Sequence, residues 1–215
     1  MPELPKELHP ENHNPTVPGQ GLTKEEAFLR MLHGHWRYLH NQRLNTETTR
    51  EDRERHAEGQ FPFAALLGCA DSRVSPEVIF DQSQGDLFVV RVAGHVAGDF
   101  EIASLEYAIE NLGVTLVIVM GHEQCGAVKA AMKGVDPHGY VGRLISEIVP
   151  AIESARGEPG DPLQNAVRAN VRCCIGHLPE RSECIRNAIS DGQLRLIGLV
   201  YDLASGDIVI HETLG

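Results

Sequence analysis

Residues 114–120 are the stretch that most restricts how this chain can fold. The stretch is almost continuously apolar and β-branched, which is the pattern of a strand covered on both faces, as in a parallel sheet. Further strand-like runs lie at residues 63–69, 86–93 and 194–201, and helical patterns separate them. Strands that alternate with helices predict an α/β fold whose central sheet is mostly parallel.

The helices and the last strand are predicted from periodicity and from residues that start or stop helices. Thr23 and Glu26 form a capping box, and the helix that follows has these apolar residues at helical spacing: Ala27, Phe28, Met31, Leu32, Trp36 and Leu39. Gly113 is expected to end a helix over residues 100–112. Further helices are predicted at residues 123–132, 140–155, 162–176 and 179–190, and residues 207–211 are expected to pair with 194–201 as an antiparallel edge.

The chain divides into a short arm and one domain. Residues 1–20 contain five prolines, a density that prevents a regular helix, so we expect an arm there. Residues 21–215 suit a single α/β domain, because a chain of this length buries a sizeable core.

Composition excludes several classes of function. The net charge of −11 argues against nucleic-acid binding, and the sequence lacks the run of about 18 apolar residues that would predict a membrane span. The five cysteines are an odd and low count, typical of a reducing compartment that keeps thiols for metal. Because the N-terminus also lacks the apolar core of a secretory signal, we expect a cytoplasmic protein.

Two short fragments carry the candidate chemistry, and each directly follows a strand-like run. They are Cys69-Ala70-Asp71-Ser72-Arg73 and His122-Glu123-Gln124-Cys125-Gly126. Chemistry collects at the carboxyl ends of strands in an open parallel sheet, so Cys69, His122 and Cys125 are predicted to meet. His122 and Cys125 are three residues apart, which on a first helical turn would place them on one side. Two cysteines and one histidine leave a coordination position open, as in catalytic zinc sites.

Asp71 and Arg73 are the candidate catalytic pair. A carboxylate beside a guanidinium forms a charge-assisted, bidentate pair, which keeps Asp71 ionised, holds it off the metal and leaves it able to accept a hydrogen bond from bound water. If the pair opened, Asp71 itself would occupy the fourth zinc position and switch the site off. This off state is a hypothesis, and an Arg73→Ala variant with zinc and full activity would argue against it.

At these residues the sequence resembles the β-class carbonic anhydrases. The similarity extends over residues 23–212 and is carried by these segments: 68–76, 85–91, 104–108, 121–128 and 201–206. The resemblance implies a central sheet of four parallel strands plus an antiparallel edge strand, flanked by helices. It also implies one zinc ion per chain, with Cys69, His122 and Cys125 as ligands.

The resemblance further implies the reaction, which is reversible hydration of carbon dioxide to bicarbonate and a proton by a zinc-bound hydroxide that Asp71 and Arg73 orient. It implies a homodimer or homotetramer, in which the helix around Phe28, Met31 and Trp36 packs on a partner subunit. One departure is His95, because many members of the family have Asn at this position.

Three other functions compete with this interpretation, and the residues disfavour the second and the third. The scaffold could hydrolyse carbonyl sulfide or carbon disulfide, since a hydroxide would attack the same linear carbon. A non-catalytic, zinc-stabilised assembly subunit has no need of the Asp71–Arg73 pair. A thiol redox protein would be expected to contain a Cys-x-x-Cys motif, which this sequence lacks.

A few other residues near the motifs or on the first helix carry expectations of their own. Gly121 and Gly126 are predicted to allow close backbone approach near the metal. His95 and His138 are candidate proton shuttles, because histidine titrates near neutrality. The remaining histidines of interest are expected to be solvated or to face another subunit: His33, His35 and His40.

Overall fold

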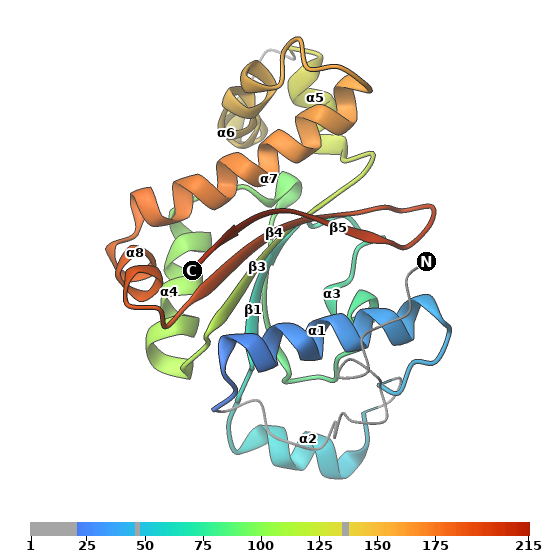
Figure 1. Ribbon diagram of the computed structural model, residues 1–215, viewed down its shortest axis with the longest axis vertical. Coiled ribbons are helices and arrows are strands. Elements are labelled where there is room, and N and C mark those ends of the chain that lie inside the picture. Colours follow the sequence, from blue (N-terminus) through green and yellow to red (C-terminus); the bar gives the residue numbers. More distant parts are fainter. Residues whose placement is uncertain (1–20, 46–47, 135–137) are drawn as a thin grey trace.

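A computed structural model describes residues 21–45, 48–134 and 138–215. The predicted arm, residues 1–20, lies outside the described residues. The described chain forms a five-stranded sheet with strand order β2-β1-β3-β4-β5, seen nearly edge-on in Figure 1. The strands are β1 (Ala64–Gly68), β2 (Leu87–Arg91), β3 (Leu116–His122), β4 (Arg195–Tyr201) and β5 (Ile208–Leu214). All neighbours are parallel except β5, which runs antiparallel to β4, so the predicted fold class is confirmed.

Helices cover both faces of this sheet (Figure 1). The long helix α7 (Pro162–Arg181) packs over β3 and β4, and α4 (Asp99–Leu112) packs over β1 and β2. On the opposite face α1 (Lys24–Leu39) crosses β3. The remaining helices are α2 (Arg50–Ala57), α3 (Pro76–Ile79), α5 (Gly126–Met132), α6 (Gly139–Ser154), α8 (Glu183–Ser190) and the 3-10 turn η3 (Ala93–His95). None of the helices in the described residues is long and apolar enough to cross a membrane.

The strand predicted from residues 114–120 is the centre of the core. All seven residues of β3 are buried, as expected for a strand covered by helices on both faces. The capping box of Thr23 and Glu26 is present at the start of α1. Gly113 ends α4 in the left-handed conformation, with φ of 70°. These local signals therefore fold as predicted.

Polar side chains make up much of the buried face of α1. Phe28, Leu32 and Trp36 are only partly buried, whereas the fully covered side chains include four polar ones, Arg30, His33, His35 and Arg37. The expectation that His33 and His35 are solvated or subunit-facing is therefore wrong, because the chain itself covers them.

The partners of α1 explain why polar side chains are buried there. Arg30 donates to Asp86 at 2.7 Å and Arg37 donates to the fully buried Asp81 at 2.5 Å. Buried charges are tolerated when they are paired and hydrogen-bonded, so these ion pairs fix α1 against the segment that connects β1 to β2.

Two helix boundaries also differ from the prediction. A helix was expected to begin at Pro179, but α7 continues through Pro179 to Arg181 and α8 begins at Glu183. Ser182 sets the break, because its backbone is extended and its hydroxyl accepts from the Ile185 N–H at 3.1 Å. This is the N-cap arrangement that starts a new helix.

Candidate active site

The predicted metal ligands converge at the carboxyl ends of β1 and β3. Cys69 directly follows β1, His122 is the last residue of β3, and Cys125 is the N-cap of α5. Their ligand atoms all lie within 4.8 Å of one another and all three side chains are buried. In the part of the chain that the structure describes, this is the only group of three or more such side chains close enough to hold a metal ion.

The way His122 reaches Cys125 corrects the prediction of a shared helical turn. His122 still belongs to the strand, and α5 begins only at Gly126. A tight turn joins them, in which Gln124 has a left-handed backbone with φ of 57°. The Glu123 N–H donates to the Tyr201 carbonyl at 2.9 Å, which extends the pairing of β3 with β4 by one residue. The turn, and not helical spacing, therefore brings the imidazole and the thiol together.

The imidazole of His122 is oriented as a metal ligand would be. Its Nδ1 lies 2.8 Å from the Glu123 carbonyl oxygen, so Nδ1 carries the proton and Nε2 has a free lone pair. Nε2 is buried and has no hydrogen-bond partner among the described residues. A histidine that binds a metal through one ring nitrogen usually donates a hydrogen bond from the other ring nitrogen, as His122 Nδ1 does here. The site therefore fits a cation that the Nε2 atom would bind.

The two thiols form a coupled pair, with Sγ atoms 4.0 Å apart. The hydrogen bond from Cys125 lowers the pKa of the Cys69 thiol, and the same contact raises the pKa of Cys125. The Gly94 N–H also donates to Cys69 Sγ, at 3.3 Å. Thiolate and imidazole donors in this number suit zinc.

Asp71 and Arg73 form the bidentate pair that the sequence predicts. Arg73 Nε donates to Asp71 Oδ1 at 2.9 Å, Arg73 Nη2 donates to Oδ2 at 2.7 Å, and the Arg73 N–H also donates to Oδ1 at 3.0 Å. The Arg73 side chain holds the pKa of the Asp71 carboxyl well below its usual range. Asp71 Oδ2 lies 3.9 Å from His122 Nε2, so the paired carboxylate borders the ligand group.

Arg91 is a site residue that the sequence does not single out. At the end of β2, its Nε donates to the Cys69 carbonyl at 2.9 Å and its Nη2 donates to the Asp71 carbonyl at 2.5 Å. These bonds hold the backbone between the ligand and the carboxylate. Its position at the carboxyl end of a strand next to β1 is the signal that could have pointed to it.

Comparison with known proteins agrees with this geometry. The sequence pattern of the family described as carbonic anhydrase matches residues 64–208. "Carbonic anhydrase 2" of Mycobacterium tuberculosis is 35% identical over 193 residues, which cover 88% of this chain and 93% of the relative. The carbonic anhydrase of Mycolicibacterium smegmatis is 34% identical over 193 residues, covering 88% and 94%.

Solved structures identify the class. A Coccomyxa β-carbonic anhydrase, in complex with acetazolamide, has a TM-score of 0.67 and 28% identity, covering 74% of this chain and 77% of its own. The β-carbonic anhydrase CcaA has a TM-score of 0.67 and 27% identity, covering 76% and 82%. This chain belongs to the β-carbonic anhydrase family. The family is one of carbonate dehydratases, which are lyases.

His95, the departure from the β-carbonic anhydrase pattern, is not placed to shuttle protons. Its side chain is 0% exposed, and burial lowers the pKa of His95 to about 4. A shuttle must exchange protons with solvent near neutral pH, so this interpretation of His95 is wrong. His138 is exposed just before α6, and its role as a shuttle remains a prediction.

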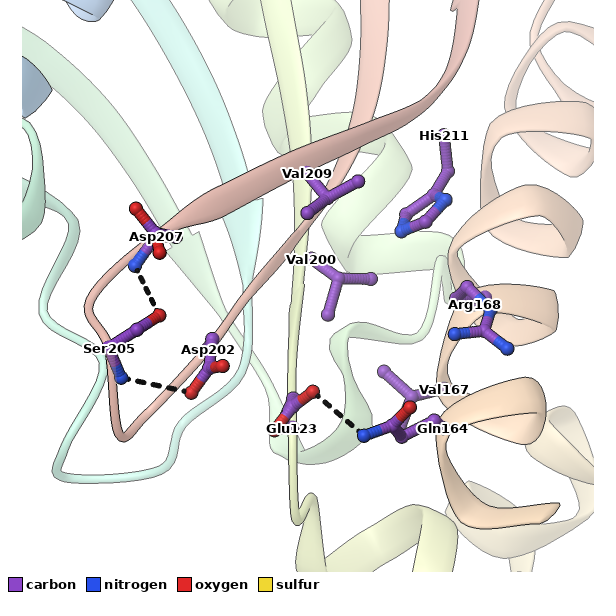
Figure 2. A pocket seen from close by; sticks show the side chains of 10 residues that line it. All are labelled: Glu123, Gln164, Val167, Arg168, Val200, Asp202, Ser205, Asp207, Val209 and His211. Carbon is purple, nitrogen blue, oxygen red and sulfur yellow. Dashed lines mark hydrogen bonds between the residues drawn. The ribbon is translucent and has the colours of Figure 1, made fainter. Parts of the chain in front are cut away.

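A hollow lies close to the predicted ligand group and is separate from it. Its volume is about 320 Å³, and Figure 2 shows that its lining side chains come from α7 and the β4–β5 hairpin among others. None of the three predicted ligands lines it. It reaches Glu123, whose carboxylate accepts from Gln164 Nε2 of α7 at 3.2 Å. Since the Glu123 carbonyl faces His122, this contact secures the residue that orients the imidazole.

Proposed function

We propose that this protein is a zinc-dependent carbonic anhydrase that catalyses the reversible hydration of carbon dioxide to bicarbonate and a proton. The observation that carries the proposal is the buried and unpartnered His122 Nε2, which lies among two thiols and 3.9 Å from the paired carboxylate of Asp71. A purely structural zinc site would use four protein ligands, whereas this group offers three.

Cys69, His122 and Cys125 would hold one zinc ion per chain. Zinc supplies a Lewis acid that makes a water molecule nucleophilic near neutral pH. The chain keeps the three donors ready for this role, because the Glu123 carbonyl fixes the tautomer of His122 and the Gly94 N–H supports a thiolate at Cys69. Loss of the proton shared by the two thiols would accompany metal binding.

Asp71 would orient the attacking solvent molecule by accepting a hydrogen bond from it. Arg73 supports this role by keeping Asp71 ionised and by holding both carboxylate oxygens in a fixed plane. The same geometry supports the hypothesis of an off state, since Asp71 Oδ2 is already near the ligand group. Release of Arg73 would let the carboxylate move the remaining distance and become a fourth ligand.

The assembly and the compartment are also proposals. We propose a homodimer or homotetramer, supported by similarity to a chain from the structures of "tetrameric beta-carbonic anhydrases" from Sordaria macrospora, with a TM-score of 0.65 and 26% identity. We propose a cytoplasmic location, supported by five cysteines that are all free thiols, as expected in a reducing compartment.

A stopped-flow assay of carbon dioxide hydration between pH 6.5 and 9, with zinc measured on the same samples, tests the proposal. We expect one zinc per chain and activity that rises with pH. Cys69→Ala and Cys125→Ala should lose both the zinc and the activity. Cys173→Ala is the matched control, since Cys173 lies on α7 outside the ligand group, and it should keep both.

Two outcomes would overturn this proposal. One zinc per chain without hydration at any pH would favour a zinc-stabilised assembly subunit. A faster reaction with carbonyl sulfide or carbon disulfide than with carbon dioxide, measured on the same protein, would favour the hydrolase.

A further inference from the structure

Asn170, on the buried side of α7, contacts the 3-10 turn η3 next to the ligand group. Its side chain is 4% exposed. Asn170 Nδ2 donates to the Gly94 carbonyl at 2.9 Å and lies 3.1 Å from His95 Nε2. One helical turn later, the Cys174 thiol donates to the His95 carbonyl at 3.5 Å. Two side chains of α7 therefore hold two consecutive carbonyls of the turn.

The turn needs this support because its backbone is strained. Gly94 has φ of 71° and His95 has φ of 45°, and a left-handed conformation is uncommon for a residue with a side chain. A Cβ atom on Gly94 would lie 2.7 Å from Ile148 Cδ1 and 3.1 Å from Ala127 Cβ. Such conformations persist only where the surroundings impose them, and they cluster at functional sites.

The strained turn points one N–H group at a predicted ligand. The Gly94 N–H donates to Cys69 Sγ at 3.3 Å, and its direction depends on the peptide plane that the left-handed turn sets. Two thiolates donate much negative charge to a metal, which weakens the polarisation of any solvent molecule bound beside them. A hydrogen bond to the sulfur withdraws part of that charge.

We propose that Asn170 is a positioning residue of the metal centre: by holding the Gly94 carbonyl and His95, it aims the Gly94 N–H at the Cys69 thiolate and so reduces the charge that the sulfur donates to zinc. The inference rests on the proposed zinc enzyme and deepens it. Asn170 touches neither substrate nor metal in this scheme, since its contacts are with the turn.

The test compares Asn170→Leu with Asn165→Leu. Asn165 is a matched control because it is a buried asparagine of the same helix whose Nδ2 donates to two backbone carbonyls, Glu158 O at 3.0 Å and Pro159 O at 3.2 Å, in a different loop. Both substitutions remove hydrogen bonds from an asparagine Nδ2 to backbone carbonyls, and Asn165→Leu also removes the bond that Asn165 Oδ1 accepts from Arg168. Only the substitution at Asn170 should change the metal centre.

The main measurement is the absorption spectrum of the cobalt(II)-substituted proteins. A thiolate that loses a hydrogen bond gives up an electron more readily, so the sulfur-to-cobalt charge-transfer band of Asn170→Leu should move to longer wavelength. The hydration rate of zinc-loaded Asn170→Leu should fall about 10-fold at pH 7 and recover by pH 9. Asn165→Leu should keep the wild-type band and the wild-type pH profile.

A band at the wild-type position in folded Asn170→Leu, or an equal shift in Asn165→Leu, would overturn the inference. If Asn170→Leu does not fold, the position of the same charge-transfer band in Asn170→Ala, which has a smaller side chain, tests the inference. Wild-type protein that binds cobalt without the charge-transfer band or shows no hydration would overturn the proposed function itself, so the two failures are distinguishable.

Discussion

Gly121 lets β3 approach α7 immediately before the predicted ligand His122. A Cβ atom added at Gly121 would lie 2.6 Å from Val171 Cγ2 and 3.2 Å from His95 Cε1. Gly126, on the other side of the ligand pair, has nothing within 4 Å of such an atom. The sequence predicts close approach at both glycines; the prediction holds for Gly121 and is wrong for Gly126. Alanine should therefore have opposite effects at the two positions.

The magnitude for Gly121→Ala follows from the overlap. Carbon atoms pack at about 3.5–4.0 Å, so the new methyl group would overlap Val171 by roughly 1 Å. Val171 cannot rotate away easily, because a β-branched side chain in a helix has one strongly preferred rotamer. Overpacking of this kind costs about 1–3 kcal/mol, and the reduced freedom of the unfolded chain returns about 0.4–1 kcal/mol. We expect a net loss of about 1–2 kcal/mol.

The methyl group added by Gly126→Ala would overlap no other atom, so no steric cost offsets the gain in stability. Gly126 is the first residue of α5, where alanine is the better helix former by up to about 1 kcal/mol. The two alanine variants should therefore differ by roughly 2 kcal/mol in the free energy of unfolding. Gly121→Ala should also lower carbon dioxide hydration, since the displaced Val171 adjoins Asn170 and the new methyl group presses on His95.

Urea denaturation of the two zinc-loaded variants, at equal protein concentration because assembly affects apparent stability, measures the difference. Stopped-flow hydration on the same samples measures the second effect. The reasoning would be refuted if Gly121→Ala were as stable as the wild type, or as stable as Gly126→Ala.

Three further predictions concern the buried and paired groups. Burial lowers the pKa of His95 from its usual 6.5 to about 4, so the unfolded chain binds a proton between these values that the folded chain does not. The contribution of neutral His95 to stability is complete above about pH 6.5 and falls by up to about 3 kcal/mol towards pH 4. Urea unfolding measured between about pH 4 and 6.5 should therefore show that the free energy of unfolding of His95→Asn changes less with pH than that of the wild type. An equal change in both proteins would contradict this. Arg73→Ala should keep zinc but lose about 10–100-fold in hydration rate as Asp71 approaches the metal, which Arg73→Lys should partly restore; full activity of Arg73→Ala would exclude the off state. Asp81→Ala should cost about 3–5 kcal/mol in thermal or urea unfolding because it leaves the buried Arg37 without its carboxylate partner. Adding Arg37→Met to Asp81→Ala should recover part of that loss. If the double variant instead loses the sum of what the two single variants lose, the pair is not coupled.

The sheet and the ligand set could be predicted because their signals are local. The apolar run that became β3 and the glycine that ended α4 depend on neighbouring residues only. The meeting of Cys69, His122 and Cys125 could be predicted because Cys69 and His122 lie at the ends of two strands, and parallel strands end at one edge of a sheet. The turn between His122 and Cys125 was not, since the left-handed Gln124 has no strong signal in the sequence.

The buried face of α1 could not be predicted, because its partners are distant in sequence. Arg37 and Asp81 are 44 residues apart, and Arg30 and Asp86 are 56 apart. Helical periodicity treats arginine as a solvent-facing residue, and only the fold brings a carboxylate to each guanidinium. Of the apolar residues predicted on this helix, Ala27 and Met31 are fully buried, and packing of the helix on a partner subunit stays a prediction.

The turn at His95 shows that a residue that departs from the family pattern can still meet the same backbone requirement. The resemblance places Asn at this position in many relatives, and the structure places His95 in a left-handed backbone with φ of 45° and with Nε2 facing Asn170. Asparagine and histidine are both enriched in this conformation relative to other residues with side chains, and both offer a hydrogen-bond acceptor. The requirement at His95 is therefore the backbone turn that directs the Gly94 N–H. It is not a protonatable ring, so His95→Asn should keep the cobalt charge-transfer band that Asn170→Leu shifts.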